Sequence, residues 1–414
     1  MKILYLNSYF YPEDVASSYL GQNVREAIIK AGMDIVLYTP VPTRGIDAKT
    51  RKEYSTDKKN EVWYDGHLVI HRFSLFKEGK NPLLRAFRYL LQEIKLFNRA
   101  VFAKDGRSCD IIKLSSTPPI HGMTAAFIKK VRHKPIVYDI QDIFPDSLVG
   151  TGLAKKGGLL WKIGRMIEDF TYRNVDRIVV ISQDFKKNIM AKGVPEEKIQ
   201  VIYNWVDENA TTPVADDDNE LFEEFGIGKD KFRVVYAGNL GNAQNIEVIL
   251  EAARILKDNK NIEFIIFGKG GLEEDIREAI KNEQLDNLRI LPLQPYERVA
   301  KVYGLGHVCI VACKPGLGGA AMPSKTWSIM SSGRAVLANF DEGELKNIVE
   351  DNLCGIFTKA GDLDAFVNAI VELAQDPGRC DLMGKNGRQF ILDNLTREIG
   401  TQKYIDVINS VVKK

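Results

Sequence analysis

The sequence predicts an α/β protein with two Rossmann-like domains, each a parallel sheet covered by helices. The chain has 414 residues, enough for two domains at roughly 100–200 residues per domain. Short, almost continuously apolar runs alternate with longer helical patterns in both halves, as in parallel sheets that are buried on both faces. Strand-to-glycine junctions recur at Val235–Gly238 and Ile265–Gly268. Two such halves are the simplest arrangement that accounts for these patterns.

The strands and helices follow from β-branched runs and from helical periodicity. We expect strands at Lys2–Leu6, Asp34–Tyr38, Leu68–Phe73, Asp110–Leu114, Pro135–Asp139, Asp176–Ser182, Phe232–Gly238, Ile262–Gly268, Leu288–Leu291, His307–Cys313 and Ala335–Ala338. We expect helices at Gly21–Ala31, Pro82–Phe102, Trp161–Arg173, Asn245–Lys257, Leu363–Ala374, Cys380–Asn394 and Glu398–Val412. The expected domains are 1–205 and 206–395, with 396–414 packing back on the first.

The acidic run Ala210–Glu220 is the best linker candidate. Its Asp216–Asp218 triplet has no neighbouring apolar strand to hold a metal site, so a solvated loop is expected.

Composition and charge exclude several classes of protein. Hydrophobic residues make up 45% and charged residues 27%, as in ordinary globular chains and unlike disordered, collagen-like or coiled-coil ones. Lys and Arg number 57 against 55 Asp and Glu, so no nucleic-acid partner is expected. The five cysteines are scattered without a C-x-x-C pair, so neither disulfides nor a zinc site is expected. Cys309 and Cys313 are expected in the core.

The ends and the apolar runs predict the location of the protein. The sequence starts directly with a strand-like run, without the pattern of a signal peptide. No apolar stretch approaches the roughly 18–20 residues that span a bilayer. We therefore expect a cytoplasmic protein without a membrane-spanning anchor.

The strongest local motif surrounds Lys325. Pro323 and Ser324 can open a helix, and the unpaired N–H groups of its first turn, together with Lys325, suit a phosphate. Upstream, the glycine run that includes Gly318 and Gly319 lets backbone approach a ligand closely. The alternative is an ordinary capped helix after a flexible loop. Because the motif follows a strand, at the edge where such sheets bind ligands, an anion site is favoured.

Two further glycine turns follow strands of the second half. Gly238 and Gly241 allow a tight strand-to-helix turn, and Asn239, Gln244 and Asn245 supply uncharged hydrogen-bonding groups. A plain turn is the alternative, but a phosphate- or sugar-facing role is favoured by the position before a helix. Gly268 and Gly270 follow the next strand, with Lys269 between them as a candidate phosphate contact.

In the first half, carboxylates follow the expected strand Pro135–Asp139. Asp139 and Asp142 are unconvincing as a metal pair because nothing completes a ligand set, so we expect no metal site. Asp142 is the better candidate for a functional carboxylate. His121 starts another helix; a capping or packing role and a substrate-binding role are equally open.

The segment Pro82–Phe102 is expected to be one amphipathic helix with a basic edge. Its apolar residues follow the i, i+3, i+4, i+7 pattern, and four basic residues lie beside that stripe: Arg85, Arg88, Lys95 and Arg99. Such a helix could face an anionic membrane surface or a phosphate-bearing lipid acceptor. A core-facing helix with a solvated basic edge is the equal alternative.

These motifs together resemble the retaining glycosyltransferases of family 4, which have the GT-B architecture of two Rossmann-like domains facing a cleft. The likeness spans the chain: Met1–Leu6 with Tyr9–Glu13, Asp142–Asp146, Val201–Asp207, Val235–Asn245 and Pro323–Lys325. The combination of Gly238–Gly241 with Pro323–Lys325 is similar to the O-antigen and capsule branch that includes the fucosamine transferases.

The resemblance implies a retaining, metal-independent enzyme of surface polysaccharide biosynthesis without a cofactor. Its donor would be a nucleotide sugar, most often a UDP-sugar, and its acceptor a saccharide on a polyprenyl diphosphate at the inner face of the cell membrane. Asp142 and Lys325 would be catalytic. The implied acceptor residues are Tyr9, Ser17, His121 and Asp142, and the implied donor residues are Gly238, Asn239, Gly241, Asn245, Gly268, Lys269, Gly270, Gly318, Gly319, Pro323, Ser324, Lys325 and Ser328.

Two departures from the family pattern concern the donor site. Ala320 and Ser328 stand where the family has two glutamates, and Asn239 and Asn245 stand where many members have an Arg and a Lys. Activity would then depend on other cations: Lys325, Lys269, Lys314 or Arg334. A GT-B binding subunit without catalysis and a UDP-sugar 2-epimerase are the alternatives, although the five histidines offer no convincing set for epimerase chemistry.

Overall fold

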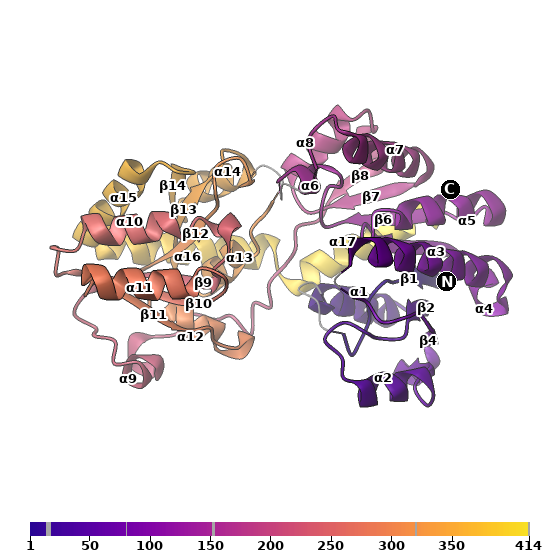
Figure 1. The fold of residues 1–414 in the computed structure, drawn as a ribbon, viewed down its shortest axis with the longest axis horizontal. Coiled ribbons are helices and arrows are strands. Elements are labelled where there is room, and N and C mark those ends of the chain that lie inside the picture. Colours follow the sequence, from indigo (N-terminus) through magenta and orange to yellow (C-terminus); the bar gives the residue numbers. More distant parts are fainter. Residues whose placement is uncertain (14–17, 80, 151–153, 319–320, 413–414) are drawn as a thin grey trace. The chain divides into compact units, whose positions relative to one another are not determined.

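The computed structural model describes residues 1–13, 18–79, 81–150, 154–318 and 321–412. The chain divides into two compact units (Figure 1). The first unit comprises Met1–Tyr203 together with the residues from Gly400 onward, and the second comprises Asn204–Ile399.

The first unit is built on an eight-stranded sheet in the order β3-β4-β2-β1-β5-β6-β7-β8. All neighbouring strands are parallel except β3 and β4. Its strands are β1 (Lys2–Leu6), β2 (Asp34–Pro40), β3 (Asn60–Trp63), β4 (Leu68–Phe73), β5 (Ile111–Ser115), β6 (Ile136–Ile140), β7 (Arg177–Val180) and β8 (Ile199–Val201). Its helices are α1 (Ser18–Lys30), α2 (Ala48–Ser55), α3 (Pro82–Phe102), α4 (Lys104–Arg107), α5 (His121–Arg132), α6 (Asp146–Gly150), α7 (Leu159–Asn174), α8 (Gln183–Ala191) and α17 (Arg397–Val412).

The second unit is built on a six-stranded parallel sheet in the order β11-β10-β9-β12-β13-β14. Its strands are β9 (Phe232–Asn239), β10 (Ile262–Lys269), β11 (Leu288–Pro292), β12 (Val308–Ala312), β13 (Ala335–Phe340) and β14 (Gly355–Lys359). Its helices are α9 (Leu221–Glu224), α10 (Glu247–Ile255), α11 (Glu273–Glu283), α12 (Val299–Gly304), α13 (Lys325–Ser331), α14 (Glu344–Asp351), α15 (Leu363–Gln375) and α16 (Pro377–Asn394).

The topology confirms the predicted fold class of two Rossmann-like domains. In the second sheet the chain starts at β9, moves outward to β11, and then crosses back to β12 on the other side of β9. The same reversal separates β1 from β5 in the first sheet. Such a switch point leaves a crevice at the carboxyl ends of its two central strands, where open α/β sheets bind ligands. The turns that follow β9 and β12 therefore have the position expected of a ligand site.

Helix α17 carries the end of the chain into the first unit. The Tyr404 hydroxyl donates to Asp139 Oδ2 at 2.9 Å, and the Lys113 ammonium lies 5.0 Å from the centre of the Tyr404 ring. Burial lowers the pKa of Lys113, and the charge of Asp139, whose Oδ2 lies 3.6 Å from Lys113 Nζ, opposes that effect. Asp139 therefore has a structural role that ties α17 to β5 and β6. Helix α16 packs instead on α13 and β13 of the second unit.

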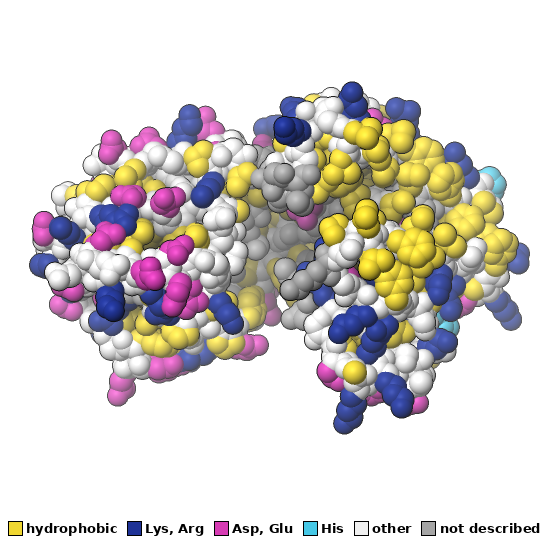
Figure 2. Space-filling view, viewed as in Figure 1, with side chains coloured by type: hydrophobic (Ala, Val, Ile, Leu, Met, Phe, Trp, Pro, Cys, Tyr) yellow, Lys and Arg dark blue, Asp and Glu magenta, His cyan; other side chains and the backbone are white. Residues whose placement is uncertain are grey.

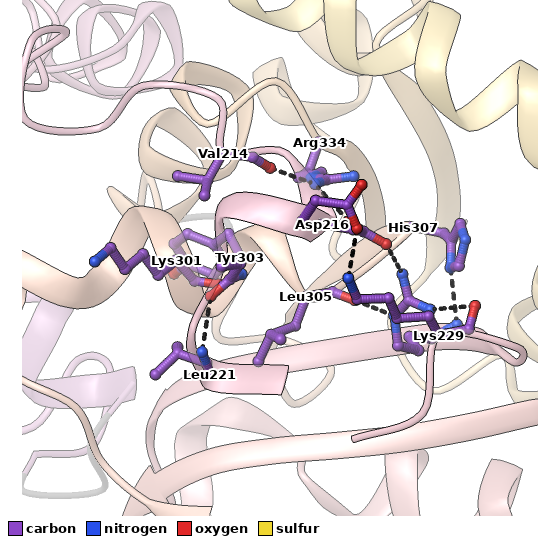
Figure 3. A network of polar contacts seen from close by, with 12 residues as sticks. Val214, Asp216, Leu221, Lys229, Lys301, Tyr303, Leu305, His307 and Arg334 are labelled. Carbon is purple, nitrogen blue, oxygen red and sulfur yellow. Dashed lines mark hydrogen bonds and ion pairs between the residues drawn. The ribbon is translucent and has the colours of Figure 1, made fainter. Parts of the chain in front are cut away.

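The acidic run expected to be a solvated linker is bound to the second unit, so this prediction is wrong for Asp216. The Asp216 carboxylate accepts from the Arg233 guanidinium at 2.7 Å and lies 3.5 Å from Arg334 (Figure 3). Arg233 is fully buried and also donates to the Leu305 carbonyl. Burial and the charge of Arg233 lower the pKa of His307 to about 4, so its neutral ring accepts from the Arg233 N–H at 3.0 Å.

Alanine substitutions of the two neighbouring aspartates are expected to differ in their effect on the free energy of unfolding. Asp216→Ala removes a carboxylate partner of a buried guanidinium, so we expect it to lower the free energy of unfolding by about 1–3 kcal/mol. Asp217→Ala is the matched control, since its side chain is 95% exposed and pairs with Lys229 at the surface; we expect a loss of less than about 1 kcal/mol. Urea unfolding of both variants measures the difference. Equal stability of the two would contradict the buried network.

Candidate functional site

Lys325 lies under the glycine turn at the switch point of the second unit. It is the first residue of α13, and its Nζ lies 4.0 Å from the centre of the Tyr236 ring in β9. A Cβ added at Gly238 would lie 2.9 Å from the same Nζ. Gly238 has a φ of 143°, which other residues rarely adopt. Glycine at this position therefore permits both the turn and the close approach of the ammonium.

The Lys325 ammonium is a buried cation without a hydrogen-bond partner among the residues that the structure describes. The residue as a whole is partly exposed, but Nζ is closed off from solvent. Burial lowers the pKa of Lys325 to about 8. An ammonium without partners is unfavourable in such a place, so the arrangement suits an anionic ligand that supplies them.

The turn after β9 is held by its own polar groups. Tyr236 donates its hydroxyl to the Asn239 carbonyl at 2.8 Å, and the Asn239 side-chain amide donates to Gln244 at 3.3 Å. A Cβ at Gly241 would meet the Asn239 amide at 2.6 Å. Asn245 is buried in the left-handed conformation, with its amide 3.5 Å from Asn339. Tyr236 was missed in the sequence because an aromatic residue inside an apolar strand carries no signal of function.

Close packing against Leu240 accounts for Gly268 and Gly270. A Cβ at Gly268 would lie 2.6 Å from the Leu240 side chain, and one at Gly270 would lie 2.5 Å from the Leu240 carbonyl oxygen. These glycines let the turns after β9 and β10 lie against each other. Lys269, between them, is exposed. This packing is enough to account for glycine at both positions. Their expected place in the lining of a nucleotide pocket stays a prediction.

The loop after β12 is fixed by Asp341, which the sequence reasoning also missed. The backbone N–H groups of Gly316 and Gly318 donate to the two Asp341 carboxylate oxygens at 3.0 and 2.7 Å. Asp341 directly follows β13 at the carboxyl edge of the sheet, which is the signal that could have indicated it. The Gly318 N–H is thus bonded to Asp341, and the expected contact of Gly318 with the donor stays a prediction. Gly319 and Ala320 lie outside the described residues.

The motif around Lys325 is formed in part as predicted. Pro323 and Ser324 precede α13, but the Ser324 side chain makes no capping hydrogen bond. Ser328 is partly exposed, and its carbonyl accepts from the Ser332 hydroxyl at 2.8 Å. Gly333 has a φ of 66° and follows the helix end, as expected.

Arg334 does not take the role expected of a compensating cation. It precedes β13, at the amino edge of the sheet, where it donates to the Val214 carbonyl at 2.9 Å and faces Asp216. Lys314 follows β12 at the carboxyl edge, and its backbone N–H donates to the Ala243 carbonyl at 2.9 Å. The candidate cations at the switch point are therefore Lys325, Lys269 and Lys314.

In the first unit, Asp142 follows β6 at the mouth of a small cavity. The lining residues are Ser116, Pro119, Tyr138, Ile140, Asp142, Phe144, Ile167, Glu168 and Tyr172. Desolvation raises the pKa of the Asp142 carboxyl above its ordinary value. Burial also raises the pKa of Glu168, against the opposing effects of Lys192, Tyr172 and Arg165. A carboxyl group whose charged form is disfavoured, at a cavity mouth, can hold or accept a proton from a bound hydroxyl.

His121 is not placed to bind an acceptor, which corrects that expectation. It is fully buried, its Nδ1 lies 2.9 Å from Glu93 Oε1, and its Nε2 lies 2.9 Å from the Leu6 carbonyl oxygen. Burial by itself lowers the pKa of His121, but the charge and hydrogen bond of Glu93 and the Leu6 carbonyl outweigh it and raise the pKa above 6.5. The packing role left open by the sequence is the one observed.

The side chain of Tyr9 is held by two residues of the first unit. Its hydroxyl lies 3.0 Å from both Glu78 Oε2 and the Tyr89 hydroxyl, and desolvation with these two neighbours raises its pKa. Its polar end is thus engaged with protein. Ser17 lies outside the described residues.

The basic edge expected to face a membrane is not formed as predicted, because Arg88 is fully buried in α3. Arg88 donates to the Phe76 carbonyl at 3.1 Å and to the Thr43 hydroxyl at 3.3 Å. The helix turns its polar residues inward to reach these partners. Among the others, Arg85 donates to the Gly79 carbonyl, Lys95 to the Ser74 carbonyl, and Arg99 lies over the Tyr38 ring. All four therefore contact the first unit itself.

Within the described ranges, no three His, Cys, Asp or Glu side chains are grouped so that they could hold a metal ion. No helix in the described part of the chain is both long and apolar enough to cross a membrane.

Comparison with protein families finds a match over each unit. Residues 22–210 match the family described as Glycosyltransferase Family 4, and residues 217–390 match the family described as Glycosyl transferases group 1.

Three curated relatives are named as glycosyltransferases. Probable glycosyltransferase WbjE of Pseudomonas aeruginosa is 26% identical over 83% of this chain and 84% of its own. The putative colanic acid biosynthesis glycosyl transferase WcaI of Escherichia coli is 31% identical over 52% of this chain and 53% of its own. The UDP-Gal:alpha-D-GlcNAc-diphosphoundecaprenol alpha-1,3-galactosyltransferase of Escherichia coli is 23% identical over 59% of this chain and 64% of its own.

Solved structures share the fold over the whole chain. Sucrose-phosphate synthase from Thermosynechococcus elongatus aligns with a TM-score of 0.75 at 17% identity, covering 99% of this chain and 98% of its own. Anabaena Alr3699/HepE in complex with UDP aligns with a TM-score of 0.70 at 16% identity, covering 99% of this chain and 100% of its own.

Proposed function

This chain is a glycosyltransferase by its two matched domains, and we propose the reaction that it catalyses. It transfers a sugar from a UDP-sugar to a lipid-diphosphate-linked saccharide in surface polysaccharide synthesis. We propose further that the anomeric configuration is retained, that the enzyme belongs to the branch that includes the fucosamine transferases, and that no metal ion takes part.

The observation that carries the proposal is the buried Lys325 ammonium, which has no hydrogen-bond partner in the described part of the chain. A nucleotide diphosphate at this place would supply the missing acceptors. In the reaction, the acceptor hydroxyl oxygen bonds to the anomeric carbon while the bond from that carbon to the diphosphate breaks. Lys325 then stabilises the charge that develops on the leaving diphosphate, and the acceptor proton passes to a departing phosphate oxygen. A cation held in advance takes the place of a metal ion in this scheme.

The proposed substrates rest on the names of similar proteins. One relative is named for a UDP-galactose donor and a diphosphoundecaprenol-linked acceptor, another for colanic acid biosynthesis, and a structural neighbour was solved with UDP. Asp142 is the proposed acceptor-side group, since its raised pKa and its place at a cavity mouth suit a hydrogen bond to a sugar hydroxyl.

A panel of nucleotide sugars tests the proposal directly. We expect UDP and UDP-sugars to raise the melting temperature, with and without EDTA, and expect transfer or slow donor hydrolysis that persists in EDTA. The anomeric configuration of the product, read by NMR, tests retention. Binding without turnover by any member of the panel would favour a non-catalytic binding subunit, and an epimer formed from UDP-GlcNAc alone would favour a 2-epimerase.

Asp142→Asn tests the acceptor-side role. The substitution keeps the shape of the side chain but removes its charge, which weakens the proposed hydrogen bond to the acceptor hydroxyl, so we expect kcat to fall by roughly 10–100-fold. Donor binding, measured calorimetrically with UDP, should stay within about threefold of wild type, because Asp142 belongs to the first unit and Lys325 to the second. An unchanged kcat would contradict the role of Asp142.

A further inference from the structure

The three neighbouring helices α3, α5 and α7 turn apolar side chains toward solvent. Figure 2 shows these hydrophobic side chains gathered over one face of the first unit. Soluble monomers rarely expose contiguous apolar patches larger than a few hundred Å². We call this surface the apolar face and define it by its exposed members: Leu83, Leu84, Phe87, Leu90, Ile94, Phe127, Val131, Leu159, Leu160, Ile163 and Met166.

The apolar face is imposed by the way α3 packs. Arg88, Gln92 and Glu93 point inward, where Gln92 donates to the Ser8 hydroxyl at 2.7 Å and Glu93 bonds His121. These polar contacts fix the rotation of the helix. The apolar stripe must then face outward, and Leu83 is 81% exposed. The predicted amphipathic helix is thus observed with its apolar side to solvent.

The neighbouring helices continue the same surface. Helix α5 packs between α3 and α7. Phe127 and Val131, one turn apart on α5, are both exposed. On α7, Leu159 and Met166 are 77% and 65% exposed. Exposed residues at helical spacing on three adjacent helices form a surface, rather than scattered single positions.

The charges around the apolar face have one sign. Helices α3, α5 and α7 together carry ten Lys and Arg residues and three acidic residues. Of the ten, Arg88 is buried, and Arg85, Lys129 and Arg165 pair with acidic side chains, which leaves six. Glu93 and Glu168 are buried, and Asp169 is paired with Arg165. Lys130 and Lys162 are exposed among the apolar side chains. A partner for the apolar face should therefore have an apolar interior and an anionic surface layer.

We propose that the apolar face docks on an anionic phospholipid bilayer, with its side chains in the acyl boundary and its basic residues at the headgroups. Helices that lie in the plane of the interface bind in this way, with long basic side chains extended toward the phosphates. A second copy of this chain fits less well, because pairing the same faces would bring two sets of like charges together. The inference is independent of the proposed reaction, since it concerns no residue of the donor site.

Vesicle sedimentation tests the inference without any nucleotide sugar. The patch variant replaces four exposed members of the apolar face, and the control replaces four similarly exposed residues elsewhere. The patch variant is Leu83→Ser, Phe87→Ser, Leu159→Ser and Met166→Ser; the control is Val62→Ser, Ile255→Ser, Leu353→Ser and Leu382→Ser. Melting temperatures first establish that both variants fold.

We expect wild type and control to bind vesicles of phosphatidylglycerol and phosphatidylcholine equally well. The patch variant should partition at least about tenfold less, because each large apolar side chain contributes to insertion. Wild type should bind pure phosphatidylcholine more weakly, and binding to anionic vesicles should fall with added salt. Equal sedimentation of patch variant and control would overturn the inference. So would a wild-type dimer, seen by light scattering, that the patch variant abolishes without a change in vesicle binding.

Discussion

Lys325→Met is expected to abolish donor binding while making the unliganded protein more stable. The ammonium is buried without a described partner, and desolvation lowers its pKa to about 8. Removing one such charge from a site that stabilises a leaving group typically costs roughly 10²–10³-fold in rate. Methionine fills nearly the same volume without a charge, so the unliganded fold should gain up to about 3 kcal/mol at neutral pH. Turnover, UDP titration and thermal unfolding measure these effects.

The sign of the pH dependence provides a further check on Lys325. Its pKa is lower in the folded chain than the ordinary value of 10.5. Between these values the unfolded chain binds more protons, so wild-type stability should rise with pH across that window relative to Lys325→Met. Lys257→Met is the control, since Lys257 is exposed near the end of α10. A Lys325→Met protein that binds UDP as wild type does would contradict the proposed donor site.

His121→Leu is expected to destabilise the first unit by about 3–5 kcal/mol, because it leaves the buried Glu93 carboxylate without its cationic partner. In the folded chain the pKa of His121 is raised above 6.5. The stabilisation from this pair is therefore fully present below about pH 6.5 and is lost as pH rises through the higher folded value. Urea unfolding of wild type and variant across that range measures the difference.

His67→Leu is the matched control for the buried pair. His67 Nδ1 lies 2.8 Å from Asp34 Oδ1, but both side chains are about half exposed. An exposed pair contributes little, so we expect a loss of less than about 1 kcal/mol. A His121→Leu protein that is as stable as His67→Leu, and that loses transfer to the acceptor while it keeps donor binding, would contradict this structural role. That result would support the acceptor-binding role first expected of His121.

Most of the architecture could be predicted from the sequence because buried parallel strands are distinctive. The bounds of β1, β4 and α3 agree with the predicted ranges, and the remaining predicted strands differ by a few residues at their ends. Strands β3, β8 and β14 were missed. Each is a short strand of three to five residues at an edge of its sheet, and so lacks the long apolar run on which the prediction depends.

The candidate site was predictable in position but not in its contacts. Helical periodicity located α3 but could not show which side faces the protein, since the inward partners Ser8, Thr43 and His121 lie far away in the sequence. The motif of Lys325 indicated an anion site, but Tyr236 beneath the ammonium and Asp341 behind the glycine loop became visible only in three dimensions. Local patterns report local structure; tertiary contacts decide the role of each residue.

Calorimetric titration of UDP at about pH 8, in two buffers of different ionisation enthalpy, tests the central claim most directly. Free Lys325 should be about half protonated there, since its pKa is about 8. A bound diphosphate should hold it fully protonated, so wild type is predicted to take up about half a proton per UDP bound. Lys325→Met should take up none, with greatly weakened binding. Tight UDP binding to wild type without proton uptake, or uptake that persists in Lys325→Met, would contradict the claim that this ammonium holds the donor diphosphate.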